Sequence, residues 1–169
     1  GMGGNFALAS PDTARTFEAL RQCELTVHIT TKLNRSHLVH GRDALILPCL
    51  GRTEIDLQDG VPQGVTVEDS MSMVHLSYGI NKPAGPNLLS ETEIVVRMAQ
   101  ATLPDSSIRW GWYLADYDRI RDAIESVYDS FYDFNQRVRV PGGFRLRNAA
   151  NEREWNTPSG AANFMTHAI

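Results

Sequence analysis

The sequence has little cysteine and no long apolar run. Its 169 residues contain two cysteines, without a CxxC pair or an HExxH motif, so a self-contained zinc or iron–sulfur site is not expected. No stretch approaches the roughly 18 apolar residues that a membrane-spanning helix requires. The first residues also lack the basic start and apolar run of a signal peptide. We therefore expect a cytoplasmic protein without a membrane partner.

An excess of positive charge is absent too. Sixteen Lys and Arg residues stand against 20 Asp and Glu residues, which gives a formal net charge of -4. This balance argues against a nucleic acid as partner. Apolar residues make up 42% of the chain and charged residues 21%, as in ordinary globular proteins. Disorder is therefore not expected, and the length suffices for one ordinary core.

Helix and strand signals alternate in the first half of the chain. Ser10, Pro11 and Asp12 predict a helix start, with Ser10 as the cap. Residues 25–30 alternate apolar and polar side chains, whereas residues 44–48 are apolar throughout, as in a strand covered on both faces. With a short helix-like crossover between them, these strands predict an α/β fold. We expect an open, mostly parallel Rossmann-like sheet with flanking helices and loop-rich segments.

The second half begins with a segment of weak periodicity. Residues 51–86 are rich in Gly, Pro, Asp and Ser, which is typical of a long irregular segment and often of a functional one. Ser90 and Glu93 have the spacing of a capping box, which predicts a helix that ends before Pro104. A further helix is expected from about Asp116. Five arginines follow, which either meet a phosphate or an acidic surface or lie in a solvated segment: Arg137, Arg139, Arg145, Arg147 and Arg153.

Two polar segments are candidates for ligand binding. Gly3 and Gly4, followed by Asn5, would let backbone amides approach a phosphate, although a flexible chain end would have the same sequence. The second segment follows the strand at 25–30, at the carboxyl end where open α/β sheets bind ligands. It is either a polar loop or a site for a ribose, a base edge or a phosphate. Its polar residues are Thr30, Thr31, Lys32, Asn34, Ser36 and His37.

The two cysteines are interpreted as buried, reduced thiols. Cys49 and His37 could be drawn as a nucleophile and its base. The sequence supplies neither an orienting third group nor an oxyanion site, so a cysteine hydrolase is not favoured.

Several motifs occur in order along nearly the whole chain. They are Met2-Gly3-Gly4-Asn5-Phe6, Ser10-Pro11-Asp12, Thr26-Val27-His28, Thr31-Lys32-Leu33-Asn34-Arg35-Ser36-His37, Leu47-Pro48-Cys49-Leu50-Gly51-Arg52-Thr53-Glu54, and the segments 67–75, 116–121 and 139–144. Together they resemble molybdopterin-dependent oxidoreductases, most closely the formate-dehydrogenase-like alpha (molybdopterin) subunit group.

The resemblance implies a cofactor and the residues that hold it. It identifies the chain as an internal fragment, the later part of the α/β domain that holds one molybdopterin guanine dinucleotide with molybdenum. In this family the Gly-Gly-Asn motif and the loop after the next strand approach the guanosine and the phosphates. Many relatives place an acidic residue at the end of that strand, where this chain has Thr30 and Thr31. The implied cofactor-binding residues are Gly3, Gly4, Asn5, Thr30, Thr31, Lys32, Asn34, Ser36, His37 and Glu54.

The resemblance also implies that the catalytic centre and the metal ligands lie outside this chain. Residues 1–104 would be a partial dinucleotide-binding domain, residues 105–150 its helical, arginine-rich extension, and residues 151–169 a linker toward a carboxyl-terminal barrel domain. The expected partners are the remaining domains of the parent enzyme and a small substrate such as formate. Alone, the fragment should be inactive and bind no cofactor tightly. The alternative is a non-catalytic α/β module that binds a nucleotide or a protein.

Overall fold

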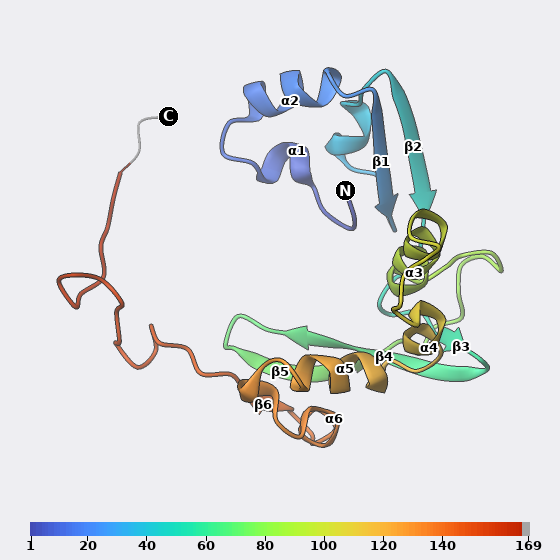
Figure 1. Cartoon of the computed structure of the whole chain (residues 1–169). Coiled ribbons are helices and arrows are strands. Elements are labelled where there is room, and N and C mark those ends of the chain that lie inside the picture. Colours follow the sequence, from blue (N-terminus) through green and yellow to red (C-terminus); the bar gives the residue numbers. More distant parts are fainter. Residues whose placement is uncertain (167–169) are drawn as a thin grey trace. The chain divides into compact units, whose positions relative to one another are not determined.

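The computed structural model of the protein describes residues 1–166 (Figure 1). These residues form two compact units. The first unit consists of residues 1–63 and 78–115, and the second of residues 64–77 and the chain from residue 116 onward. Each unit has its own cluster of buried apolar side chains.

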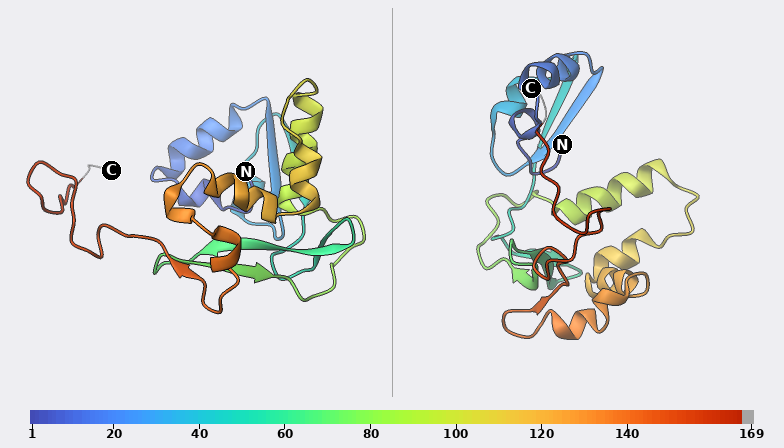
Figure 2. Two further views of the ribbon diagram at one scale, coloured as in Figure 1. Left: turned by 60° about the horizontal axis from the view of Figure 1, so that its bottom comes forward. Right: turned by 90° about the vertical axis from the view of Figure 1, so that its left-hand side faces the viewer.

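The strands form two separate sheets, so the expectation of an open, mostly parallel Rossmann-like sheet is wrong. One sheet is parallel and pairs β1 with β2, which lie side by side in Figure 2. The other is antiparallel and has the strand order β3-β4-β5-β6; the boundary between the two units lies within β4. The strands β1 to β6 span Leu25–Thr30, Asp43–Pro48, Asp56–Gln58, Val61–Glu68, Met73–Tyr78 and Phe144–Arg145.

The antiparallel strands occupy much of the segment that was expected to be irregular, and short turns explain the difference. Asp59 and Gly60 join β3 to β4 with φ angles of 49° and 78°, as in a two-residue hairpin. Between β4 and β5, the Asp69 carboxylate accepts from the N–H groups of Met71 and Met73 at 2.8 and 3.0 Å. Such turns bring consecutive strands back antiparallel, whereas a parallel sheet needs long crossover connections.

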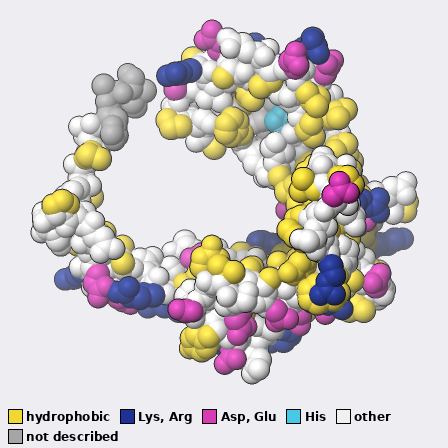
Figure 3. Space-filling view, in the orientation of Figure 1, with side chains coloured by type: hydrophobic (Ala, Val, Ile, Leu, Met, Phe, Trp, Pro, Cys, Tyr) yellow, Lys and Arg dark blue, Asp and Glu magenta, His cyan; other side chains and the backbone are white. Residues whose placement is uncertain are grey.

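The parallel pairing of the first two strands is confirmed, but the burial of the second is not as expected. Leu25 lies opposite Asp43, and Thr30 lies opposite Pro48. All six residues of β2 are exposed, although its apolar sequence predicts a strand covered on both faces. Hydrophobic side chains are accordingly visible at the surface over β2 and α3 (Figure 3). An apolar sequence shows that a strand can be buried on both faces. It does not show whether other residues of the same chain cover those faces.

The helices of the first unit are short. They are α1 (Phe6–Ala9), α2 (Thr13–Arg21), the 3-10 helix η1 (Arg35–Leu38), α3 (Glu91–Thr102) and α4 (Trp110–Ala115). Within residues 1–166, no helix combines the length and the apolar character needed to cross a bilayer.

The ends of two helices test the sequence signals directly. The Ser90 hydroxyl accepts from the Glu93 N–H at 3.2 Å, and α3 ends before Pro104, so the predicted cap residue and the predicted end of this helix are confirmed. The cap of α2 differs from the prediction. Asp12 caps this helix by accepting from the Arg15 N–H at 3.0 Å, whereas Ser10 ends α1.

The second unit is built around aromatic side chains. Its helices are α5 (Asp118–Glu125), the 3-10 helix η2 (Asp129–Phe131) and α6 (Phe134–Arg137), and α5 confirms the helix expected from about Asp116. Its buried core consists of Val74, Phe134, Val138 and Phe144. The core joins side chains of β5, α6 and β6 with the residue that follows α6, so it depends on contacts between distant parts of the sequence.

A buried arginine organises the polar side of this unit. Arg121 has 4% of its surface exposed. Its guanidinium donates to Asn135 Oδ1 at 2.6 Å and to the Gly64 carbonyl at 2.9 Å, and it also pairs with Asp118. Arg139 contacts both carboxylate oxygens of Asp118, at 2.7 and 2.5 Å. Asp118 therefore joins two cations, and every arm of the buried guanidinium has a partner.

Other late arginines are also engaged within the second unit. Arg137 lies over the rings of Tyr132 and Phe144, with its guanidinium carbon 3.9 and 3.8 Å from the ring centroids. Arg147 pairs with Glu152 and Glu154. The side chains of Arg137, Arg139 and Arg147 thus contact other residues of their own unit.

Candidate functional site

The opening glycine segment is attached to the end of β1. The Gly3 N–H donates to the Ile29 carbonyl at 2.8 Å, and the Ile29 N–H donates to the Gly1 carbonyl at 2.9 Å. Gly3 has a φ of 65°, a conformation that favours glycine. Gly3, Gly4 and Asn5 are all exposed. These residues therefore form an ordered, accessible backbone edge beside the strand.

The polar loop after β1 is joined to this glycine segment. Asn34 Nδ2 donates to the Gly4 carbonyl at 3.1 Å, and the Ser36 hydroxyl donates to Asn5 Oδ1 at 3.2 Å. The Ala7 N–H donates to the same Ser36 hydroxyl at 3.0 Å. The structure thus brings together the two segments that sequence reasoning selected as one site.

Several predicted contact residues have side chains that hold the loop itself. Ser36 is fully buried, and Thr30 and His37 are nearly so. The Thr30 hydroxyl donates to the Lys32 carbonyl at 2.7 Å, and His37 Nδ1 accepts from the Asn34 N–H at 2.8 Å. These side chains hold the loop in its conformation. Their predicted contact with a cofactor stays a prediction.

Only half of the predicted cofactor-binding residues are exposed to solvent. These are Gly3, Gly4, Asn5, Thr31 and Lys32. In the described part of the chain, no carbonyl accepts from the N–H of Gly4 or of Asn5. Free backbone amides, one hydroxyl and one ammonium group are the donors that a phosphate requires.

Glu54, the last of the predicted site residues, joins the loop after β2 to the loop before α3. Its carboxylate accepts from the Gly51 N–H at 2.6 Å and from the Ala84 N–H at 2.5 Å. Gly51 follows the end of β2, and Ala84 lies in the loop before α3. The structure therefore places Glu54 as a clamp between two loops, while contact with a cofactor remains a prediction for it.

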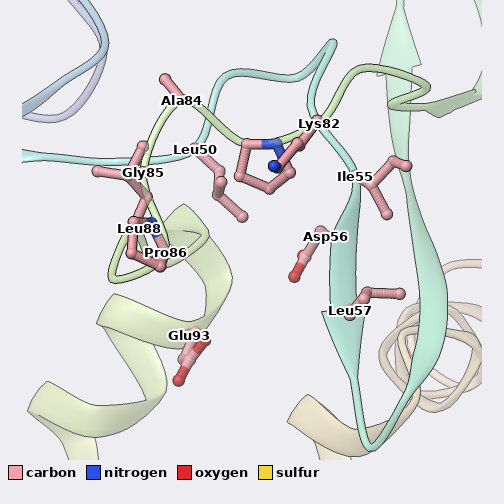
Figure 4. A pocket seen from close by; sticks show the side chains of 11 residues that line it. Leu50, Ile55, Asp56, Leu57, Lys82, Ala84, Gly85, Pro86, Leu88 and Glu93 are labelled. Atoms are coloured by element: carbon pink, nitrogen blue, oxygen red, sulfur yellow. The ribbon is translucent and has the colours of Figure 1, made fainter.

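A pocket of about 530 Å³ lies beside this clamp in the first unit (Figure 4). Apolar side chains from the two loops and β3 form much of its wall. The side chains of Asp56 on β3 and Glu93 on α3 also line the pocket, and Lys82 lies on the loop before α3 (Figure 4). Gln58 Nε2 donates to both carboxylates, at 2.7 and 3.4 Å. The sequence analysis did not predict this pocket. The only sequence feature that could have indicated it is the pair of prolines, Pro83 and Pro86, in the loop before α3.

Two buried histidines lie beneath the glycine segment. The rings of His28 and His37 are 4.8 Å apart, and Nε2 of each is buried without a partner among residues 1–166. Burial lowers the pKa of His28, and the neighbouring His37 and the amino-terminal ammonium group lower this pKa further. No group of three or more His, Cys, Asp or Glu side chains suited to a metal occurs in the described residues.

The cysteines differ in their surroundings. Cys49 is buried, as expected, but Cys23 is exposed, which corrects the prediction for that residue. Burial raises the pKa of the Cys49 thiol, and the carboxylates of Glu91 and Glu54 raise this pKa further. A protonated thiol is a poor nucleophile, so the raised pKa of Cys49 gives no support to a cysteine hydrolase.

Comparison with known proteins finds relatives that are much longer than this chain. Protein YdeP of Escherichia coli K12 is 58% identical over 165 residues, which are 98% of this chain and 22% of that protein. A Mycobacterium tuberculosis H37Rv protein named as an uncharacterized oxidoreductase is 52% identical over 171 residues, covering the whole chain and 22% of that protein. The chain thus spans about a fifth of the length of these curated relatives. No family model and no solved structure matches the sequence.

Proposed function

We propose that this chain is part of a larger oxidoreductase and holds the dinucleotide tail of its cofactor. The observation that carries this proposal is the hydrogen-bonded junction of the Gly3–Gly4–Asn5 segment with the loop over 31–37, beside the end of β1. The name of the mycobacterial relatives supports the redox class. The cofactor that we propose is molybdopterin guanine dinucleotide with molybdenum, in an enzyme similar to formate dehydrogenase.

The exposed residues of the junction fit a phosphorylated guanosine. The Gly4 and Asn5 amides would donate to phosphate oxygens, Lys32 would neutralise their charge, and Thr31 would add a hydroxyl. The buried side chains of the loop would keep these donors in place. When bound, the group supplies the redox metal, while the protein contributes binding and orientation.

The remaining parts of the enzyme are proposed to lie in other polypeptide segments. These include the metal ligands, the pocket for a small substrate such as formate, and the partner domains. Within this scheme, residues 1–104 belong to the dinucleotide-binding domain, residues 105–150 extend it, and residues 151–169 lead to a barrel domain. The length of the curated relatives is consistent with such an arrangement.

A binding experiment on the chain tests the role of the junction. We expect saturable chemical-shift changes on titration with guanosine diphosphate, with an affinity in the millimolar range because an isolated part supplies only some of the contacts. Lys32→Gln should weaken the binding about fivefold or more, since one charge-assisted hydrogen bond is lost. The chain has only one other lysine, Lys82 in the pocket of Figure 4, so Lys82→Gln is a matched control and should leave the affinity unchanged.

A second measurement on the full-length relative decides the identity of the cofactor. The Escherichia coli protein purified from molybdenum-replete cells should contain metal and release guanosine monophosphate on acid hydrolysis. The variant at the position equivalent to Lys32 should retain less of both. Absence of metal and nucleotide from the folded full-length protein would refute the proposal and favour a non-catalytic module.

A further inference from the structure

The two buried histidines of the first unit each lack a hydrogen-bond partner at one ring nitrogen. His28, on β1, and His37, on η1, both have 7% of their surface exposed, and their ring centroids are 4.8 Å apart. Nε2 of each ring is buried and has no partner in the described part of the chain. A buried polar atom without a partner is costly, and the cost is far greater when the ring is charged. The folded pair therefore favours the neutral form of both rings.

The charged groups around this pair do not compensate an added proton. Burial lowers the pKa of His28, and the neighbouring ring and the amino-terminal ammonium group lower it further. The loop and η1 add the cations Lys32 and Arg35, and α1 carries no charge. The carboxylates of the adjoining elements are Asp43 on β2 and Glu91 on α3, and neither pairs with either ring. A proton on His28 is thus harder to add in the folded chain than in an unfolded one.

His37 holds the residue that joins the loop to the glycine segment. Its Nδ1 accepts from the Asn34 N–H at 2.8 Å, which requires an Nδ1 without a hydrogen. The Asn34 side chain caps η1 by accepting from the Ser36 N–H at 2.9 Å, and it donates to the Gly4 carbonyl at 3.1 Å. The glycine segment is therefore held in part through the neutral form of His37.

Protonation would change this chain of contacts at its first bond. A hydrogen on His37 Nδ1 would face the Asn34 N–H, because the acceptor has become a donor. The Asn34 carbonyl oxygen, 3.0 Å from Nδ1, is an acceptor for the new N–H. A ring that turns to this oxygen leaves the Asn34 N–H without a partner, and the buried Nε2–H of the charged ring still has no acceptor among the described residues. Acid should therefore move Asn34 from its position beside Gly4.

We propose that the dinucleotide junction is sensitive to acid, because protonation of His37, packed against His28, releases Asn34 from Gly4. His37 is then a positioning residue, and the consequence for a cofactor rests on the proposed function. Because the pKa of His28 is lowered in the folded chain, the stability of the junction is complete above the ordinary histidine pKa of about 6.5 and decreases as pH falls below it. The junction is thus closed at neutral pH and opens in mild acid.

Amide hydrogen exchange on the full chain tests this inference directly. The protection factor of the Asn34 N–H, which compares its exchange rate with that of an unstructured chain, should decrease about tenfold or more between about pH 7.5 and about pH 5.5. The Glu93 N–H is a matched control, because the Ser90 hydroxyl caps it in the same unit without a histidine. Equal protection of the Asn34 N–H at both pH values, or a decrease that the Glu93 N–H shares, would overturn the proposal.

Two histidine variants separate the effect of pH from a general loss of packing. Glutamine at the third helical position also accepts from the N-cap N–H but does not titrate, so His37→Gln should keep the Asn34 N–H protected at both pH values. His40→Gln changes an exposed histidine after η1 and should leave the wild-type pH profile unchanged. Persistence of that profile in His37→Gln would contradict the assignment to His37.

Binding of guanosine diphosphate distinguishes this inference from the proposed function. From about pH 7.5 to about pH 5.5, the wild-type affinity should decrease about fivefold or more relative to that of His37→Gln, a comparison that cancels protonation of the phosphate itself at about pH 6. Absence of binding at every pH would refute the proposed function, while the exchange profile would still decide whether the junction responds to acid. Binding with the same pH dependence in both proteins would refute the positioning role of His37.

Discussion

At the residue scale, the least predictable feature is the burial of charged groups. Asp118 and Arg121 have the spacing of an exposed helical ion pair, and the pair does form. The structure nevertheless buries Arg121, because Asn135 and the Gly64 carbonyl complete its hydrogen bonds. Sequence spacing reveals that two side chains can meet, but a buried guanidinium requires acceptors from distant segments.

The Asp118 cluster should make the second unit sensitive to acid. Burial raises the pKa of Asp118, but hydrogen bonds from Arg121 and Arg139 and their positive charges outweigh burial, so the net pKa is lowered. Since the folded-state pKa is below the unfolded one, the stabilisation is present above the ordinary Asp pKa and is lost as pH falls through the folded value.

Urea unfolding of Asp118→Asn checks this sign. We expect the variant to be less stable than the wild type at neutral pH by about 1 kcal/mol or more, allowing for solvent screening of this partly exposed group. The difference should shrink as pH falls below about 3.9. Asp129→Asn, an exposed carboxylate of the same unit, is the control. A difference that is independent of pH would contradict the assignment.

Adjacent glycines offer a second residue-scale test. Gly142 and Gly143 have φ angles of 85° and 70°. A Cβ on Gly143 would lie 1.9 Å from the Val74 carbonyl oxygen, whereas a Cβ on Gly142 would meet nothing within 4 Å. Gly142→Ala should cost about 1 kcal/mol for its backbone conformation, and Gly143→Ala at least about 2 kcal/mol more because β5 must shift. Equal midpoints in thermal unfolding would show that the close approach carries no cost.

At the element scale, local signals located both ends of α3 and the start of α5, and they missed the antiparallel strands. Ser90 and Pro104 mark the ends of α3 because capping and proline effects act within a single turn. The hairpin of β3 and β4 has the Asp59-Gly60 pair typical of such turns, but its short strands lack a clear alternation. Strand pairing then depends on partners that no single segment reveals.

The start of α2 allows the two interpretations of its cap to be compared. In the structure Asp12 accepts from the Arg15 N–H, while the Ser10 hydroxyl donates to the Phe6 carbonyl. Asp12→Ala should therefore lower the free energy of unfolding by about 1 kcal/mol, and Asp12→Asn by less than half of this amount. Ser10→Ala should have a smaller effect, measured by urea denaturation under the same conditions. A larger loss in Ser10→Ala would restore the sequence-based assignment of the cap.

At the scale of the whole molecule, the organisation into two units was not expected. Residues 64–77 belong with the chain from residue 116 onward, although the segments before and after 64–77 belong to the first unit. Such interleaving arises because the Val74 and Phe144 pair of the antiparallel sheet draws distant segments together. Changes in composition along the chain can indicate domains that follow one another in the sequence. They cannot indicate a unit that is built from two separate segments.

The candidate site shows the same division between local and distant information. Gly3, Lys32 and Asn34 were selected from the sequence because glycine and polar side chains near a strand end suit a phosphate. The resemblance implies that both segments approach the same ligand, and the structure joins them through the Asn34–Gly4 and Ser36–Asn5 hydrogen bonds. The pocket of Figure 4 was not expected, because its walls come from segments that meet only in the folded chain.

The sequence alone determined the parallel β1–β2 pair, the limits of α3 and the polar residues that follow β1, because each depends on neighbours within one turn or on a short connection. Only the tertiary structure decided the antiparallel sheet, the burial of Arg121 and the exposure of β2. Those features arise from hydrogen bonds and apolar contacts between residues far apart in the chain, whose free energy exists only once the loops between them have closed.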